Sequence, residues 1–186
     1  MHYTSNIPAS LLPDNEKERL QHLYRYEILN TAPEEIYDNI ARKAMGIFNT
    51  PIACVNFVDR DHVFFKSHVG DEGCTVLPRY ASFCSIAIHN RPVTVFPDTH
   101  QFPQLRANPF ANGINDDNQA VRFYVGAPLR TPEGTQIGTV CAVDNVAHPS
   151  ITEAQALQLF ALASQVMDEL NMRLRVRSLL KGKSLN

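Results

Sequence analysis

Residues 122–144 read RFYVGAPLRTPEGTQIGTVCAVD, a sequence typical of two β-strands joined by a turn. The segments Arg122–Leu129 and Gln136–Val143 are both rich in β-branched and aromatic residues, which favour strands. Between them, residues 131–134 read TPEG, in which proline fixes φ and glycine is free to adopt a positive φ. We therefore predict a β-hairpin.

Both strands of this hairpin are apolar on both faces, apart from Arg122 and Tyr124 in the first strand. In the first strand, alternation predicts one face made of Val121, Phe123, Val125, Ala127 and Leu129, and a second made of Arg122, Tyr124, Gly126 and Pro128. In the second strand it predicts one face made of Ile137, Thr139, Cys141 and Val143, and a second made of Gly138, Val140 and Ala142. This pattern predicts a central hairpin that is covered on both sides.

Length and composition indicate a single globular domain with flanking helices. The chain has 186 residues, of which 44% are apolar and 19% are charged. A net charge of −2 gives no electrostatic reason to expect binding to nucleic acid or to an anionic membrane. Neither a signal peptide nor a bilayer-spanning apolar run is present in the sequence, so we expect a cytoplasmic location.

The four cysteines are Cys54, Cys74, Cys84 and Cys141. They form no CxxC pair and no tight cluster with histidine, so we expect no metal site and no metal cofactor. In a reducing compartment we expect four free thiols, two of them in buried strands.

Three helices are predicted from capping residues and apolar periodicity. Asp14 is expected to cap the first helix, whose apolar stripe would be Leu20, Leu23, Tyr24 and Ile28. Thr31 and Glu34 form a capping-box pattern before a second helix that would bury Ile36, Ile40, Ala44 and Ile47. Ser150 and Glu153 form the same pattern before a final helix of roughly 30 residues.

Further strands are predicted at residues 52–58, 63–69 and 93–96. Residues 63–69 are expected at a sheet edge, with Lys66 and His68 facing water. Residues 82–90 are expected to form a short helical elbow. Residues 97–119 form a long loop, and a loop of this length in a compact domain is typical of a lid or binding loop.

The final helix carries two apolar stripes. The first contains Leu159, Leu162, Val166, Leu170 and Leu174, which we expect to cover the sheet. The second contains Met172, Val176 and Leu179 and lies about 200° further round the helix. A change of apolar face indicates a second partner, and the same helix of another copy of the chain is the simplest one, so we expect a homodimer.

Several segments resemble the GAF domains of bacterial sensor histidine kinases and diguanylate cyclases. The matching segments are ERLQHLYRYEILNTAPEEIYDNIARKA, PIACVNFVDRDHVFFKS, SFC at residues 82–84, FPDTHQFPQLRANPF, RFYVGAPLRTPEGTQIGTVCAVD and the last helix. The resemblance covers about residues 15–178. We therefore divide the chain into an irregular segment 1–13, a GAF domain 14–178 with its flanking helices, and a C-terminal tail 179–186.

The resemblance implies an α+β fold of the GAF-like and PAS-like type. Its central antiparallel sheet of five or six strands would carry the N- and C-terminal helices on one face and a loop-roofed pocket on the other. It also implies a stand-alone sensory module that binds a small molecule or a signalling protein and dimerises through its terminal helices. Because the sequence ends at Asn186, we expect no catalytic output domain, and the signal would pass to a kinase or cyclase partner.

The family also implies that Asp98, Arg122 and Tyr124 lie together at the pocket, with Cys84 and His89 beside them and His100 as a further candidate. A carboxylate, a guanidinium and a phenol would orient a small polar ligand through charge-assisted hydrogen bonds. The alternative is a salt bridge between Asp98 and Arg122 that only ties the roof loop to the sheet.

Cys74 and Cys84 flank the expected roof and allow two further hypotheses. One is a redox-responsive disulfide between them, and the other is a free methionine-R-sulfoxide reductase, because GAF-fold enzymes of that kind resemble this arrangement. Those enzymes use a further catalytic cysteine in the loop before the central hairpin, and residues 97–119 contain none. A bilin-binding role is disfavoured because Cys84 is followed by Ser85 rather than by histidine. We therefore expect no enzymatic activity and no cofactor.

Overall fold

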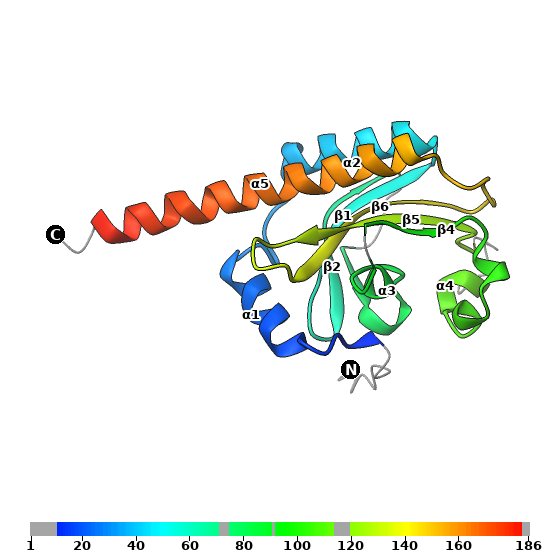
Figure 1. Cartoon of the computed structure of the whole chain (residues 1–186), viewed down its shortest axis with the longest axis horizontal. Coiled ribbons are helices and arrows are strands. Elements are labelled where there is room, and N and C mark those ends of the chain that lie inside the picture. Colours follow the sequence, from blue (N-terminus) through cyan, green and yellow to red (C-terminus); the bar gives the residue numbers. More distant parts are fainter. Residues whose placement is uncertain (1–10, 71–74, 91, 114–119, 184–186) are drawn as a thin grey trace.

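The computed structural model describes residues 11–70, 75–90, 92–113 and 120–183 (Figure 1). The α-helices are α1 (Glu16–Arg25), α2 (Glu35–Phe48), α3 (Cys84–Ala87), α4 (Pro109–Asn112) and α5 (Glu153–Lys183). The 3-10 helices are η2 (Arg79–Ala81), η3 (Thr99–Gln101) and η4 (Pro103–Leu105). The strands are β1 (Ile52–Val58), β2 (His62–Val69), β3 (Val76–Pro78), β4 (Thr94–Phe96), β5 (Phe123–Arg130) and β6 (Gln136–Asp144).

The strands form one antiparallel sheet in the order β3-β2-β1-β6-β5-β4. The predicted hairpin is confirmed as β5 and β6, and each strand starts and ends within one residue of the prediction. Strands β1 and β6 lie at the centre, where each strand has a neighbouring strand on both sides. The two edges are β3 and β4, which have three residues each.

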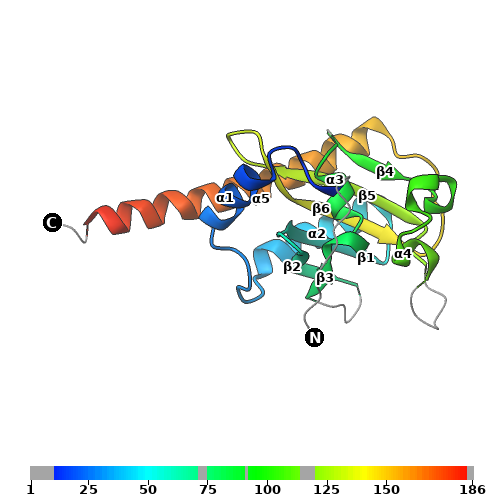
Figure 2. The same ribbon diagram turned by 90° about the horizontal axis from the view of Figure 1, so that it is seen from below.

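The two faces of the sheet carry different elements (Figures 1 and 2). Helices α2 and α5 lie side by side on one face, and their apolar side chains join one face of the sheet in the larger core. Helix α3 and the segment containing η3, η4 and α4 lie on the other face, the roof side, over a second core. Helix α1 lies at the end of the sheet, where His22 contacts Thr135 beside the β5–β6 turn.

A β-bulge places Ile137 of β6 on the face of the sheet opposite to the one predicted. Leu129 pairs with Gly138 and Arg130 pairs with Gln136, so Ile137 has no partner in β5. The extra residue reverses the alternation, and Ile137 joins the helix-side core instead of sharing a face with Cys141. The predicted common face for Ile137 and Cys141 was therefore wrong.

The predicted caps of the first two helices were also wrong. Helix α1 has Asn15 rather than Asp14 at its N-cap, and it ends at Arg25, before Ile28. The N-cap of α2 is Glu34, and the hydroxyl of Thr31 donates instead to the carbonyl oxygen of Ile28. Ile36 of α2 is exposed, since the buried face of this helix is made of Tyr37, Ile40, Ala41, Ala44 and Phe48.

The capping box of α5 lies two residues later than predicted. The hydroxyl of Thr152 accepts from the backbone nitrogen of Gln155 at 3.2 Å, and Oε1 of Gln155 accepts from the backbone nitrogen of Thr152 at 3.0 Å. Ser150 and Glu153 fit the same sequence pattern but do not form this pair. The other end of the Gln155 amide donates to the carbonyl oxygen of Ile47 at 3.0 Å, which fixes the start of α5 to the end of α2.

Both predicted stripes of α5 are confirmed. Leu159, Leu162, Val166 and Leu170 are buried against the sheet, and Leu174 packs at the margin of the same core. The second stripe is exposed: Met172, Val176 and Leu179 retain 54%, 49% and 69% of their surface. The helix continues to Lys183, into the segment predicted to be a tail, and its last part extends beyond the sheet (Figure 1).

Lys66 is buried, contrary to the predicted wet face of residues 63–69. Strand β3, and not β2, lies at the edge of the sheet. The segment that leads into α2 covers Lys66 on the face of the sheet that carries α2 and α5. The ammonium group of Lys66 donates to the hydroxyl of Thr31 at 2.7 Å and to the carbonyl oxygen of Ala32, and it lies 2.7 Å from a carboxylate oxygen of Glu34. These oxygens take the place of water as partners of the buried ammonium group.

Strands β1 and β6 approach each other closely at Gly138, so we expect a side chain at this position to destabilise the fold. A Cβ atom at this position would lie 2.0 Å from the backbone oxygen of Asn56, so Gly138→Ala is expected to lower the free energy of unfolding by at least about 2 kcal/mol. Gly46, inside α2, is the matched control, because apart from its chain neighbours and the backbone of its own helix no described atom lies within 4 Å of a Cβ there. Gly46→Ala should raise the unfolding free energy by about 0.5–1 kcal/mol. Urea unfolding measures both, and equal effects of the two substitutions would contradict this packing.

Candidate functional site

Asp98 and Arg122 form a bidentate pair at the margin of the roof side. Nε and Nη2 of Arg122 each donate to one carboxylate oxygen of Asp98 at 2.9 Å. Asp98 also caps η3, because its side chain accepts from the backbone nitrogen of His100. The hydrogen bond from Arg122 lowers the pKa of Asp98 to about 2.

This pair fastens η3 to the residues just before β5. The backbone nitrogen of Thr99 donates to the carbonyl oxygen of Arg122 at 2.7 Å, and its hydroxyl donates to that of Val121 at the same distance. The side chains of Arg122 and Asp98 keep 33% and 15% of their surface, so part of the guanidinium faces solvent. The pair therefore ties the roof segment to the sheet, and the side chain of Arg122 stays partly exposed.

Tyr124 lies deeper in the roof-side core, with its hydroxyl 3.6 Å from the sulfur of Cys84. Its ring centroid is 5.4 Å from that of Phe83 and 6.0 Å from that of Phe96. The ring lies over Gly126, where a Cβ atom would be 2.3 Å from the tyrosine hydroxyl. Gly126 therefore makes room for Tyr124, which neighbouring side chains enclose.

A polar cluster beneath α3 includes two residues that the sequence analysis did not select, Asn56 and Thr139. The amide nitrogen of Asn56 donates to the sulfur of Cys84 at 3.2 Å and to the hydroxyl of Thr139 at 3.0 Å. The Thr139 hydroxyl donates back to the Asn56 amide oxygen at 3.1 Å. Asn56 and Thr139 are direct partners on β1 and β6, and both are fully buried. Their signal in the sequence is a single polar residue inside each apolar strand.

Three thiols meet at this cluster. The sulfurs of Cys84 and Cys141 are 3.9 Å apart, and Cys54 is the cross-strand partner of Cys141. The contact with Cys141, together with burial, raises the pKa of the Cys84 thiol well above its usual range. The contact with Cys54 is the largest cause of the raised pKa of Cys141. All three thiols are free and buried, and the raised pKa values of Cys84 and Cys141 favour their protonated, unreactive form.

Because these three thiols are buried, we expect them to be alkylated slowly in the native protein. In the native protein, iodoacetamide at pH 8 is expected to label Cys54, Cys84 and Cys141 at least about tenfold more slowly than in the urea-unfolded protein, because burial blocks access to all three thiols and the raised pKa values of Cys84 and Cys141 also make their thiolates scarce. Peptide mass spectrometry after timed quenching gives the rate for each cysteine. Native labelling of Cys84 at the unfolded rate would show that the roof opens readily.

The other predicted site residues lie elsewhere. His89 follows α3 and is exposed. His100 is exposed, and its Nε2–H donates to the carbonyl oxygen of Ala111 at 2.9 Å. Cys74 lies outside the described residues, so its proposed pairing with Cys84 stays a prediction. The structure thus brings Cys84 together with Tyr124, and Asp98 together with Arg122.

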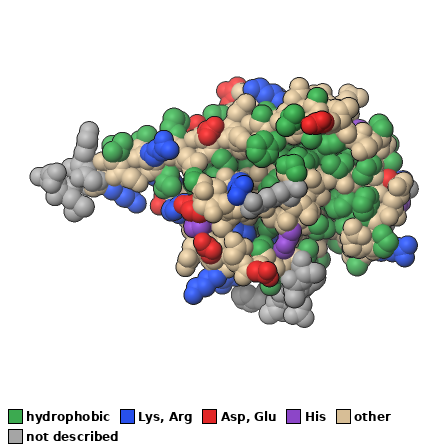
Figure 3. Space-filling view, viewed as in Figure 1, with side chains coloured by type: hydrophobic (Ala, Val, Ile, Leu, Met, Phe, Trp, Pro, Cys, Tyr) green, Lys and Arg blue, Asp and Glu red, His purple; other side chains and the backbone are tan. Residues whose placement is uncertain are grey.

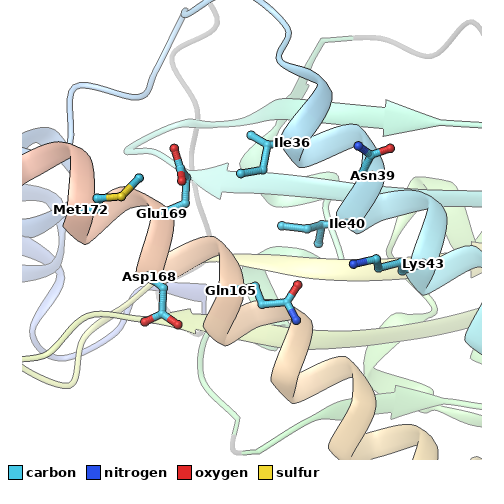
Figure 4. A pocket seen from close by; sticks show the side chains of 8 residues that line it. All are labelled: Ile36, Asn39, Ile40, Lys43, Gln165, Asp168, Glu169 and Met172. Atoms are coloured by element: carbon cyan, nitrogen blue, oxygen red, sulfur yellow. The ribbon is translucent and has the colours of Figure 1, made fainter.

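A concave feature lies on the face of the sheet that carries α2 and α5 (Figure 4). It is an open groove of about 470 Å³ between α2 and α5. Its lining residues are Ile36, Asn39, Ile40 and Lys43 from α2, and Gln165, Asp168, Glu169 and Met172 from α5. The sequence analysis did not predict this groove, which depends on the spacing of two helices that are far apart in the chain.

Two further features were searched for among the described residues. No group of three or more His, Cys, Asp and Glu side chains in those ranges is arranged to hold a metal ion. None of the helices in the same ranges combines the length and the apolar character needed to cross a bilayer.

Comparison with known proteins agrees with this architecture. Residues 32–170 match the GAF domain family. The chain is 30% identical over 155 residues to a cyclic di-GMP phosphodiesterase of Pseudomonas aeruginosa, a match that covers 83% of this chain and 26% of that protein's length.

Solved structures share the fold. A domain of a two-component sensor histidine kinase protein from Sinorhizobium meliloti superposes with a TM-score of 0.59 at 14% identity, covering 82% of this chain and 99% of that one. The free methionine-R-sulfoxide reductase of Neisseria meningitidis superposes with a TM-score of 0.56 at 19% identity, covering 83% and 87%. With its family match, six-stranded antiparallel sheet and terminal helices, the chain belongs to the GAF domain family.

Proposed function

We propose that this GAF sensory or regulatory domain acts as a homodimer through its terminal helices and passes on a signal without catalysing a reaction. The observation that carries the proposal is the exposed apolar stripe Met172, Val176 and Leu179 on α5. These side chains are already partly covered, so burying the remaining surface of each would contribute roughly 1–2 kcal/mol, which favours association. A signal that alters the sheet would reach the partner through α5, which packs on β5 and β6.

Light scattering at micromolar concentration tests the dimer. The unmodified chain should have the mass of two copies, and Val176→Glu with Leu179→Glu should give a single copy, because two carboxylates would have to be buried in the contact. Ser178→Glu is the matched control, since Ser178 is exposed on another side of the same helix. A single-copy mass for the unmodified chain would refute this part of the proposal.

The input would be a small molecule or a signalling protein on the roof side. The partly exposed side chain of Arg122 supports an anionic or polar ligand at the Asp98–Arg122 margin, since the side chains around Tyr124 are packed against one another. Native mass spectrometry of protein purified from its own cells would reveal a co-purifying molecule. If none is found and metabolite titrations leave the melting temperature unchanged, a dimerisation scaffold without a ligand is the better assignment.

The output partner would be a signalling enzyme such as a kinase or a cyclase. The chain spans about a quarter of the cyclic di-GMP phosphodiesterase that it matches, so a link to enzymes of cyclic di-GMP metabolism is part of the proposal. Co-purification of the dimer with such an enzyme, and its loss with the Val176→Glu and Leu179→Glu variant, would support this link.

The alternative function is reduction of free methionine-R-sulfoxide by Cys84 with Cys74. The burial and raised pKa of Cys84 argue against a reactive thiolate at this position. Loss of methionine-R-sulfoxide coupled to NADPH and thioredoxin would establish the reductase, whereas no turnover at high protein concentration would remove it.

A further inference from the structure

We propose that Cys84 and Cys141 are a redox pair, which a small peroxide oxidises to a disulfide that fixes the roof helix α3 to the central strand β6. Their sulfurs lie 3.9 Å apart, although the two residues are separated by 57 positions in the chain. The hypothesis drawn from the sequence joined Cys84 to Cys74 instead. Oxidation of the Cys84–Cys141 pair requires neither a bound ligand nor a second copy of the chain.

The two sulfurs come from elements that differ in their freedom to move. They need to approach by about 2 Å to reach the length of an S–S bond. Cys84 is the first residue of α3, a helix of four residues, so a small shift of this helix is enough. Cys54 is the competing partner of Cys141, but these two residues lie opposite each other on β1 and β6, whose spacing the sheet already fixes. The pair with Cys84 is therefore favoured.

The amide group of Asn56 orients both sulfurs. Its nitrogen donates to the sulfur of Cys84 at 3.2 Å and to the sulfur of Cys141 at 3.5 Å. The hydroxyl of Tyr124 also donates to the sulfur of Cys84, at 3.6 Å. Hydrogen-bond donors of this kind stabilise the negative charge that develops on sulfur during thiol chemistry. Asn56 is thus a positioning residue for the proposed reaction.

Apolar packing around the pair selects a small and neutral oxidant. Hydrophobic side chains gather over α3, β4 and β5 on the face of the molecule that Figure 3 shows. Cys84 and Cys141 belong to the roof-side core, and they keep only 4% and 2% of their surface exposed. A bulky, charged oxidant such as glutathione disulfide would have to lose its hydration on entering this core, whereas hydrogen peroxide is small and uncharged.

Oxidation starts in those molecules in which α3 has moved away from the sheet, because the thiolate of Cys84 is accessible only there. The thiolate sulfur attacks one oxygen of the peroxide, the O–O bond breaks, and the hydroxide that leaves is protonated to water. Cys84 is then a sulfenic acid. When the roof closes, the sulfur of Cys141 attacks the sulfur of Cys84, the S–O bond breaks, and the thiol proton leaves with the hydroxide as a second water. The two thiols together lose two electrons, and the peroxide gains them.

Disulfide mapping in the unmodified full chain tests the pair. The reduced protein is treated with hydrogen peroxide, the remaining thiols are blocked with N-ethylmaleimide in urea, and the peptides are analysed by mass spectrometry without reduction. A peptide that links Cys84 to Cys141 should be the main product, and dithiothreitol should remove it. Cys74→Ser should give the same product in the same yield.

Three results would overturn the redox pair. The first is a main product that links Cys74 to Cys84 or Cys54 to Cys141. The second is Cys84 recovered as sulfinic acid without any disulfide. The third is a native protein that stays fully reduced under conditions that oxidise the urea-unfolded chain.

A pair of serine variants tests the opening of the roof. Ser85→Ala removes the hydrogen bond from the Ser85 hydroxyl to the carbonyl oxygen of Arg79 at 2.7 Å, which holds α3 to η2. The matched control is Ser164→Ala, which removes a similar bond to the carbonyl oxygen of Phe160 within α5, on the other face of the sheet. Ser85→Ala should form the disulfide about fivefold faster than the unmodified chain, and Ser164→Ala at the unchanged rate. Equal rates for all three proteins would overturn oxidation through an open roof.

Discussion

Replacing Glu16 with glutamine is expected to lower the free energy of unfolding by about 3 kcal/mol, because it leaves two buried arginines without a counter-charge. Arg19 and Arg79 are both at most 1% exposed. The carboxylate of Glu16 accepts from Nε of Arg19 at 2.8 Å and from Nη1 of Arg79 at 2.5 Å. The three side chains join α1 to η2, which immediately precedes the roof helix α3.

Thermal unfolding measures this loss, and for a chain of this size it corresponds to a fall in melting temperature of roughly 10 °C. Glu18→Gln is the matched control, because Glu18 is exposed on the same helix. Equal melting temperatures for the two variants would mean that backbone carbonyls alone satisfy the arginines.

The carboxylate of Glu16 also makes the free energy of unfolding depend on pH. Burial alone would raise the pKa of Glu16, but hydrogen bonds from Arg19 and Arg79 outweigh burial and lower it below the ordinary value of 4.5. The contribution of Glu16 is therefore complete above about pH 4.5 and is lost as the pH falls through the lower pKa of the folded state. Unfolding free energies measured between pH 6 and pH 3 should accordingly fall more steeply in the unmodified protein than in Glu16→Gln.

Replacing Glu34 with glutamine is expected to lower the free energy of unfolding by about 2–3 kcal/mol, because Lys66 would keep only neutral partners in a buried position. Oxygens of Glu34 lie 2.7 Å from Nζ of Lys66 and 2.6 Å from Nη2 of Arg173. Glu34 thus joins β2 to the helix that we propose transmits the signal.

A double-mutant cycle isolates this interaction. Lys66→Met removes the buried charge and keeps an apolar stem, so Glu34→Gln combined with Lys66→Met should recover at least about 1 kcal/mol of the loss caused by Glu34→Gln alone. Glu35→Gln, at an exposed neighbouring residue, is the control. Strictly additive single effects would show that Lys66 does not depend on Glu34.

Acid titration adds a second measurement for Glu34. Hydrogen bonding from Arg173, followed by that from Lys66, lowers the pKa of Glu34 from 4.5 to about 2. Because the folded-state pKa is lowered, the contribution is present above about pH 4.5 and disappears as the pH falls towards 2. Glu34→Gln should remove this part of the acid sensitivity.

The elements that sequence alone predicted well are those with a strong local period. The β5–β6 hairpin alternates apolar residues on both faces, and α5 repeats leucine and valine at helical spacing, so neither depends on distant contacts to be recognised. The Ser150–Glu153 and Thr152–Gln155 pairs both fit a capping box, and the local sequence does not choose between them. The additional bond from Gln155 to Ile47 favours the second pair, and that bond exists only in the folded chain.

Only those contacts of the candidate site that the family resemblance implied could be predicted from the sequence. The resemblance implied that Asp98 and Arg122 lie together, and the structure confirms their contact. The Asn56–Thr139 pair depends on the register of β1 against β6, which a one-residue slip would destroy. Lys66 was misjudged because its cover comes from Thr31 and Ala32, about 35 residues earlier in the chain.

The short margins of the sheet bear on how the protein behaves in concentrated solution. An exposed edge strand has unpaired backbone N–H and C=O groups, to which a strand of another chain can form hydrogen bonds. Such strand addition is the first step of fibril growth. Here β3 and β4 present only three residues each; Pro78, which lacks an N–H, ends β3, and Pro97 directly follows β4. Growth by strand addition is therefore disfavoured at both margins, and the dimer that we propose on the helical face would be a closed pair instead of an open-ended polymer.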